Sequence, residues 1–126
     1  MTFVDDTYNA NPDSMRAALD LLNDLSGKRH IAVFGDMAEL GAHAEKEHRD
    51  LGRDIANSKI SKLYCLGMLS GLTAEEARNA GVDAWHTEKA EELIDRLRRE
   101  LKRGDTVLFK ASRSIALDEV VKALVA

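Results

Sequence analysis

The chain has 126 residues, of which 44% are hydrophobic and 32% are charged, and its formal net charge is −4. This length suits a single domain with one hydrophobic core, and no apolar run approaches the roughly 20 residues that a membrane span needs. The acidic balance argues against nucleic acid as a main partner. One cysteine, Cys65, and no secretory signal pattern predict a reducing, cytoplasmic setting.

Short apolar runs alternate with amphipathic patterns along the whole chain. In chain order, we expect a strand at 2–4, a helix from 12 to about 27, a strand at 30–34, a helix over about 45–58, a strand at 63–66, a short helix from about 73 to 81, a strand at 83–86, a helix from 87 to 103, a strand at 106–109 and a last helix through 117–124. This alternation predicts an α/β fold.

Local signals set several of these boundaries. Asn11 is a good N-cap, and Pro12 suits the first helical position. Thr73 and Glu76 form the pattern of a capping box, which predicts the start of a short helix. The run from 30 to 34 is continuously apolar and ends at a glycine, as buried parallel strands do.

Strands separated by helices of this length predict a single three-layer, Rossmann-like domain over residues 1–126, with a mostly parallel sheet and helices on both faces. Ligands of such open sheets bind beyond the carboxyl ends of the strands. Four segments occupy these positions, namely residues 5–11, 35–41, 67–71 and 110–114. Three of them hold clusters of polar side chains.

The first cluster follows the first strand and contains Asp5, Asp6, Thr7, Tyr8, Asn9 and Asn11. Carboxylates can bind ribose hydroxyls, amides can contact adenine or phosphate, and a tyrosine ring can stack on a base, so a nucleotide or substrate edge is one interpretation. The alternative is a capped turn, in which Asn11 caps the helix and Asp6 accepts loop amides. The residue types leave both interpretations open.

The second cluster is the loop of residues 35–41, GDMAELG, in which glycines at both ends permit a tight backbone path. Asp36 or Glu39 is a candidate to hold the ammonium group of an amine substrate. In the alternative interpretation, both acids are solvated or cap backbone amides of an ordinary strand-to-helix loop. The local pattern favours this second interpretation.

The third cluster is the run of residues 110–114, KASRS. Lys110, Ser112, Arg113 and Ser114 form a candidate edge for a carboxylate or phosphate group. The alternative is an N-capping Ser114 beside a solvated Arg113. Because Lys110 ends an apolar strand at the ligand-binding edge, binding is favoured here.

Other chemical signatures are missing from the sequence. There is no G-x-x-x-x-G-K-[ST] phosphate loop. The order of residues shows no nucleophile arrangement of the Ser/His/Asp or Cys/His kind. His43 and His48 are five residues apart, a spacing that does not put both on one helical face as a zinc pair needs. We therefore expect no metal ligands and no complete catalytic centre in this chain.

Three landmarks together resemble the C-terminal domain of the Mur ligases, and within that family the ligases that add D-alanyl-D-alanine to a UDP-muramoyl-tripeptide. They are residues 6–14 (DTYNANPDS), residues 33–41 (VFGDMAELG) with His48, Arg49 and Gly52 after them, and residues 110–114 (KASRS). The landmarks stand in the family's order and span nearly the whole chain.

The resemblance implies a three-domain, cytoplasmic and monomeric enzyme of peptidoglycan precursor synthesis, with an N-terminal domain for the UDP-muramoyl-tripeptide and a central domain with the ATP phosphate loop. ATP phosphorylates the substrate carboxylate, and the amine of D-alanyl-D-alanine attacks the acyl phosphate, with Mg²⁺ neutralising charge. The C-terminal domain closes over the site and excludes water. Because this chain contains neither of the other two domains, the resemblance implies that it is inactive alone.

The resemblance also implies site residues. For the nucleotide these are Asp6 at the ribose, with Tyr8, Asn9 and Asn11; for the dipeptide they are Asp36, Glu39, Lys110, Ser112, Arg113 and Ser114. Two alternatives stay open: a domain of another Mur-like or folylpolyglutamate-type amide ligase, and a free-standing α/β module that binds a nucleotide or peptide.

Overall fold

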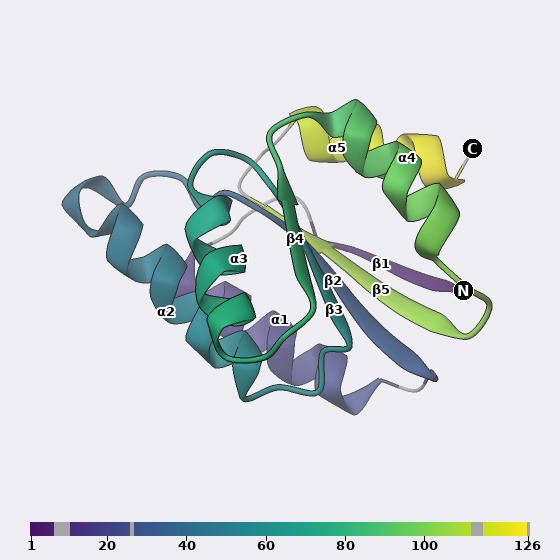
Figure 1. Ribbon diagram of the computed structural model, residues 1–126, viewed down its shortest axis with the longest axis horizontal. Helices are drawn as coiled ribbons and strands as arrows, with labels where there is room; N and C mark the ends of the chain where they lie inside the picture. Colours follow the sequence, from purple (N-terminus) through teal and green to yellow (C-terminus); the bar gives the residue numbers. More distant parts are fainter. Residues whose placement is uncertain (7–10, 26, 112–114, 126) are drawn as a thin grey trace.

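The computed structural model describes residues 1–6, 11–25, 27–111 and 115–125 (Figure 1). The elements, in chain order, are β1 (Thr2–Asp6), α1 (Pro12–Asp24), β2 (Arg29–Gly35), the 3₁₀ turn η1 (Gly41–His43), α2 (Ala44–Ala56), β3 (Lys62–Leu66), α3 (Ser70–Asn79), β4 (Ala84–Thr87), α4 (Ala90–Glu100), β5 (Asp105–Lys110) and α5 (Ile115–Val125). None of the helices in these ranges has the length and apolar character that crossing a membrane requires.

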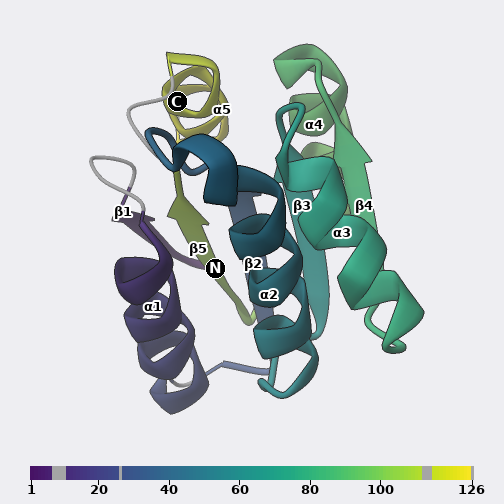
Figure 2. The same ribbon diagram turned by 90° about the vertical axis from the view of Figure 1, so that its left-hand side faces the viewer.

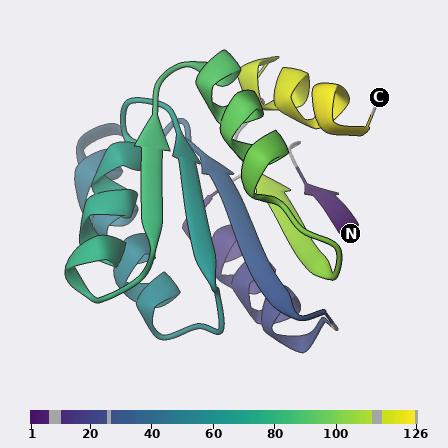
Figure 3. The same ribbon diagram turned by 45° about the vertical axis from the view of Figure 1, so that its right-hand side comes forward.

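The five strands form one sheet in the order β1-β5-β2-β3-β4, and each pair of neighbouring strands is parallel. Helices α1, α2 and α3 cover one face, as Figure 2 shows, and α4 and α5 cover the other face (Figure 3). The expected three-layer α/β fold is confirmed, with a wholly parallel sheet in the described part of the chain. The sequence did not predict that the last strand lies between the first and the second.

Two apolar clusters lie on the two faces of the sheet, because side chains alternate along each strand. Ala32 and Phe34 of β2 face α1, α2 and α3 in one cluster. Ile31 and Val33 of the same strand face α4 and α5 in the other. Such two-sided burial explains why β2 is a continuous apolar run rather than an alternating one.

Helix α1 begins as the sequence predicts. The Asn11 side chain accepts the backbone N–H of Ser14 at 2.9 Å, the Ser14 hydroxyl accepts the backbone N–H of Asn11 at 3.0 Å, and Pro12 is the first helical residue. The two residues thus satisfy two N–H groups that the helix leaves without partners.

The capping box expected at Thr73 is wrong. Helix α3 begins at Ser70, and Thr73 lies inside it, where its hydroxyl donates a hydrogen bond of 2.8 Å to the carbonyl of His48 on α2. A buried tertiary partner has therefore taken the hydroxyl that the local pattern assigned to a helix start. Helix α4 also begins later than expected, at Ala90, because Thr87 still belongs to β4.

A buried ion pair joins the amino ends of β2 and β5, which are neighbours in the sheet. Arg29 donates to both carboxylate oxygens of Asp105, at 2.8 and 2.7 Å, and also to the carbonyl of Glu100 at 3.0 Å. The Asp105 side chain is 1% exposed and that of Arg29 is 34% exposed. Burial alone would raise the pKa of Asp105, but the hydrogen bonds from Arg29 and the backbone of Lys102 outweigh it, so this pKa lies below its ordinary value.

This ion pair predicts sensitivity to acid. A carboxyl group with a lowered pKa stabilises the fold above its unfolded-state pKa, and this stabilisation is lost as the pH falls through the folded-state pKa. We expect Asp105→Asn to be about 1–3 kcal/mol less stable than the wild type near neutral pH. Between about pH 7 and pH 3 it should lose less stability than the wild type, by urea denaturation. An equal loss in both proteins would contradict the role of this pair.

Candidate functional site

The order of the strands creates a switch point at the edge of the sheet where all five strands end, here called the carboxyl edge. From β1 and β2 the chain leads to α1 and α2 on one face, whereas from β5, which lies between them, it leads to α5 on the other face. Open α/β sheets bind ligands beyond the carboxyl ends of their strands, at a switch point of this kind.

The register brings the ends of the three strands together. Asp6 of β1 is opposite Lys110 of β5, and Lys110 is opposite Phe34 of β2 on its other side. The residues next along, Gly35 and Ala111, are so close that a Cβ atom on Gly35 would lie 2.6 Å from that of Ala111. The three polar clusters found in the sequence therefore begin at one place.

Of the expected dipeptide contacts in residues 110–114, the structure describes Lys110, the last residue of β5. It is 2% exposed, and the alternation of side chains puts it on the same face of the sheet as Leu108, toward α1 and α2. Its burial at the carboxyl edge makes Lys110 the strongest charge-bearing candidate in the described part of the site.

Asp36 follows β2 and links two loops. Its Oδ2 accepts the backbone N–H of Leu69 at 3.2 Å and its Oδ1 that of Ser70 at 2.7 Å, so its carboxylate caps the start of α3. This corresponds to the amide-capping interpretation of the sequence, although the contacts were not expected to lie in the next loop of the sheet.

His48 of α2 fixes the backbone of the same loop. Its side chain is fully buried; Nδ1–H donates to the carbonyl of Ala44 at 2.7 Å, and Nε2 accepts the backbone N–H of Met37 at 3.0 Å. These partners assign the neutral ring with the proton on Nδ1. Histidine spacing gave no sign of this contact, since it depends on the path of the loop.

The middle of the loop holds an uncommon backbone conformation. Glu39 is exposed and has a φ of 61°, a left-handed conformation that few residues other than glycine adopt, and Gly41 has a φ of 55°. Strained residues of this kind concentrate at ligand sites. Glu39 therefore extends from the carboxyl edge on a backbone that the buried Met37 and His48 hold in place.

Several expected site residues lie outside the described part of the chain: Tyr8, Asn9, Ser112, Arg113 and Ser114. For Asp6, the structure gives the backbone position and pairing alone. Asn11 is described, and its side chain is occupied in capping α1. The structure thus places the backbones of Asp6 and Lys110 opposite each other at the carboxyl edge, with Asp36 in the loop that follows β2.

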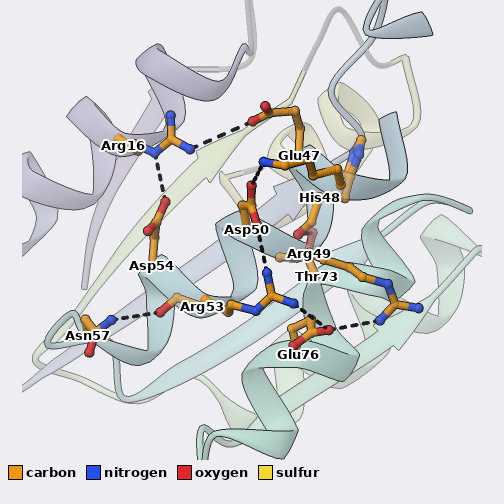
Figure 4. A network of polar contacts seen from close by, with 11 residues as sticks. Arg16, Glu47, His48, Arg49, Asp50, Arg53, Asp54, Asn57, Thr73 and Glu76 are labelled. Carbon is orange, nitrogen blue, oxygen red and sulfur yellow. Dashed lines mark hydrogen bonds and ion pairs between the residues drawn. The ribbon is translucent and has the colours of Figure 1, made fainter. Parts of the chain in front are cut away.

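A network of polar contacts joins the three helices α1, α2 and α3 on one face of the sheet (Figure 4). Arg16 of α1 donates to Asp54 of α2 at 2.8 Å, and Arg49 and Arg53 of α2 both pair with Glu76 of α3, at 3.1 and 3.4 Å. Exposed pairs contribute little individually. As a network across three helices, they fix α2, which carries His48, relative to its neighbours.

Within the described residues, no group of three or more His, Cys, Asp or Glu side chains is arranged to hold a metal ion.

Comparison with known proteins gives consistent matches. The model of the family "Mur ligase, glutamate ligase domain" matches residues 1–113. A curated relative, the UDP-N-acetylmuramoyl-tripeptide–D-alanyl-D-alanine ligase of Bacillus subtilis (strain 168), is 37% identical over 129 residues, which cover 99% of this chain and 28% of the relative. The chain thus spans little more than a quarter of the length of such relatives.

Solved structures agree in fold. One structure of MurF from Acinetobacter baumannii superimposes with a TM-score of 0.80 at 35% identity and covers 97% of this chain and 27% of that protein. The MurF ligase from Thermotoga maritima in complex with ADP gives a TM-score of 0.75 at 30% identity, with coverage of 96% and 27%.

The hydrogen bond between the Met37 N–H and His48 Nε2 can be tested by replacing His48 with glutamine and with asparagine. His48→Gln retains an acceptor near the position of Nε2, whereas His48→Asn reaches only as far as Nδ1. We expect faster amide hydrogen exchange at Met37 in His48→Asn but not in His48→Gln, and a loss of about 1–3 kcal/mol of stability in the former. Equal protection of Met37 in both variants would show that Nε2 does not hold the loop.

Proposed function

The chain belongs to the Mur ligase family, as a glutamate ligase domain, and from this membership we propose that it is the C-terminal domain of an ATP-dependent ligase that joins D-alanyl-D-alanine to UDP-N-acetylmuramoyl-tripeptide. The observation that carries the proposal is the meeting of the three polar clusters at the ends of β1, β5 and β2. The curated relatives of that name, at 37% identity in the case of Bacillus subtilis, favour this ligase over other amide ligases.

The charges at the carboxyl edge fit the incoming dipeptide, which has an amino group at one end and a carboxylate at the other. Lys110 comes from β5, whereas Asp36 and Glu39 come from the loop after β2. We assign the dipeptide carboxylate to Lys110 with Ser112, Arg113 and Ser114, and its ammonium group to Asp36 and Glu39. Each oxygen of Asp36 accepts one amide and retains a lone pair for a cation.

The nucleotide is assigned to the first cluster, with Asp6 at the ribose and Tyr8, Asn9 and Asn11 around it. The Thermotoga maritima relative was crystallised with ADP, which supports a nucleotide in such ligases. When bound, ATP supplies the phosphoryl group that makes the substrate carboxylate reactive toward an amine. We propose that Mg²⁺ binds mainly in the central domain of the complete ligase, beside the phosphates of ATP.

The proposed contribution of this domain is orientation and exclusion of water. The overall reaction consumes a carboxylate, an amine and ATP and yields an amide, ADP and phosphate, and water competes with the amine. A domain that closes over the carboxyl edge holds the amine near the activated carboxyl group and keeps water out. We also propose that the ligase is monomeric and cytoplasmic, which the unpaired thiol of the buried Cys65 supports.

The first test concerns the division of labour between domains. We expect the 126-residue chain alone to show no ATP hydrolysis that depends on D-alanyl-D-alanine, since it has no phosphate loop. The complete ligase proposed to contain it should release ADP only when both the tripeptide and the dipeptide are present. Steady turnover by the isolated chain would contradict the proposal.

A second test concerns Lys110. In the complete ligase, Lys110→Met keeps most of the buried side chain but removes the charge, so the KM for D-alanyl-D-alanine should rise roughly ten- to a hundredfold. Lys28→Met is the matched control, because Lys28 packs beside Gly104 at the opposite end of the sheet. Equal KM values for Lys110→Met and the wild type would exclude Lys110 from the dipeptide site.

A further inference from the structure

Residues 67–70 run from the end of β3 into the first residue of α3 and form a fourth segment of the carboxyl edge. None of the substrate contacts proposed above involves them. This loop lies beside the end of β2, since Leu66 is opposite Gly35 in the sheet. In the sequence, this segment had no polar cluster to mark it as a site. In the structure, the side chains of Asp36 and His86 form hydrogen bonds with its backbone.

Hydrogen bonds from both neighbouring strands fix this loop. From the side of β2, Asp36 accepts the N–H groups of Leu69 and Ser70. From the side of β4, the His86 ring donates through Nε2–H to the carbonyl of Gly67 at 2.6 Å, and the Gly67 N–H donates to the carbonyl of Thr87 at 3.0 Å. The loop is thus held at its two ends by two different strands.

Asp36 performs a task that α3 does not perform for itself. The residue at the N-cap position, Leu69, has no side chain that can accept an N–H, and α3 has no acidic residue in its first turn. The carboxylate of Asp36 supplies both the acceptors and the negative charge that favour the start of a helix. The stability of this turn therefore depends on a residue that is more than 30 positions away in the sequence.

Two glycines make room for the side chains that hold the loop. A Cβ atom on Gly67 would overlap Oδ1 of Asp36, and the φ of Gly67 is 132°, which disfavours other residues. A Cβ atom on Gly71 would lie 3.0 Å from Cε1 of the His86 ring. The contacts of Asp36 and His86 thus require these two positions to lack side chains.

The residue in the middle of this fixed loop is apolar and faces solvent. Met68 is 75% exposed, whereas the backbone on either side of it is hydrogen-bonded. The other large exposed apolar side chains of the described chain, Met1, Leu21 and Val125, belong to the start of the chain and to α1 and α5. A methionine on a rigid support is well suited to contact a small alkyl group.

We infer that Asp36, in addition to the ammonium contact proposed above, positions residues 67–70 as a further wall of the substrate site, and that this wall offers Met68 as an apolar contact to the alkyl side chain of the incoming amine. The inference rests on the proposed function, because that function places the amine substrate at the carboxyl edge. If Asp36 acted only through its charge, the position of residues 67–70 would not affect the affinity for the substrate. In the inferred role, the position of these residues also determines that affinity.

The variants Asp36→Asn and Gly67→Ala separate these two roles. The first removes the negative charge, whereas the second leaves the charge and displaces the carboxylate from the loop. In the 126-residue chain, we expect both to speed amide exchange at Leu69 and Ser70 by roughly ten- to a hundredfold. Asp24→Asn, which removes an exposed carboxylate from the end of α1, is the matched control and should leave both amides protected.

In the complete ligase, we expect Gly67→Ala, Asp36→Asn and Met68→Ala each to raise the KM for the dipeptide by about tenfold, with little change in kcat or in the KM for ATP. Met68→Ala should do so without changing amide exchange. If Gly67→Ala frees the loop but leaves the KM unchanged, the loop is not a wall of the site and the inference is wrong. Protected amides in Asp36→Asn would also overturn it.

The two proposals fail in different ways. If the unaltered complete ligase shows no turnover that depends on the dipeptide, the proposed function is rejected and Met68 loses its assigned partner. The exchange measurements on the 126-residue chain still decide whether Asp36 holds the loop, since they require no substrate.

Discussion

The insertion of β5 between β1 and β2 is the constraint on which the remaining structure depends. It gives β5 a hydrogen-bonding partner on each side and a helical layer on each face, so all six of its residues are buried, including the charged residues at its two ends. At the amino end, Asp105 is paired with Arg29 and stabilises the sheet. At the carboxyl end, Lys110 lies between the ends of β1 and β2. One central strand thus connects the Arg29–Asp105 ion pair with the candidate site.

The carboxyl edge is stiffened by polar groups that bind backbone rather than one another. His48 holds the loop after β2, and Asp36 and His86 hold the loop after β3. In each case, a side chain from one element satisfies a main-chain group of the next, so adjacent loops are fixed relative to each other. Such support from outside the contact residues keeps a binding site in its productive geometry. It also means that a residue at this edge can affect binding without touching a ligand.

Sequence patterns predicted the parts of the structure that depend on neighbours in the chain. The apolar run from 30 to 34 and the Asn11 cap gave the class of fold and the start of α1, because these signals are local. The position of β5 was not predictable, since periodicity does not identify the partner of a strand. The local pattern gave Thr73 the wrong role and did not give the partners of Asp36, because the partners of both side chains are distant in sequence. Thr73 bonds to His48, and Asp36 bonds to the start of α3. The resemblance supplied the candidate site residues, whereas the hydrogen bonds of His48 and Asp36 could be found only from the fold.

The placement of β5 also sets the order in which the protein can assemble during synthesis. In the described sheet β1 pairs only with β5, with Thr2 opposite Thr106, so the first of the five strands pairs only after the fifth has been made. β2, β3 and β4 pair with one another in sequence and can associate earlier with α2 and α3. Contacts between such distant segments slow folding, because a long loop must close before they form. Until residues 105–110 leave the ribosome, β1 and the edge of β2 that pairs with β5 lack their partner strand, and unpaired strand edges of this kind can associate with other chains.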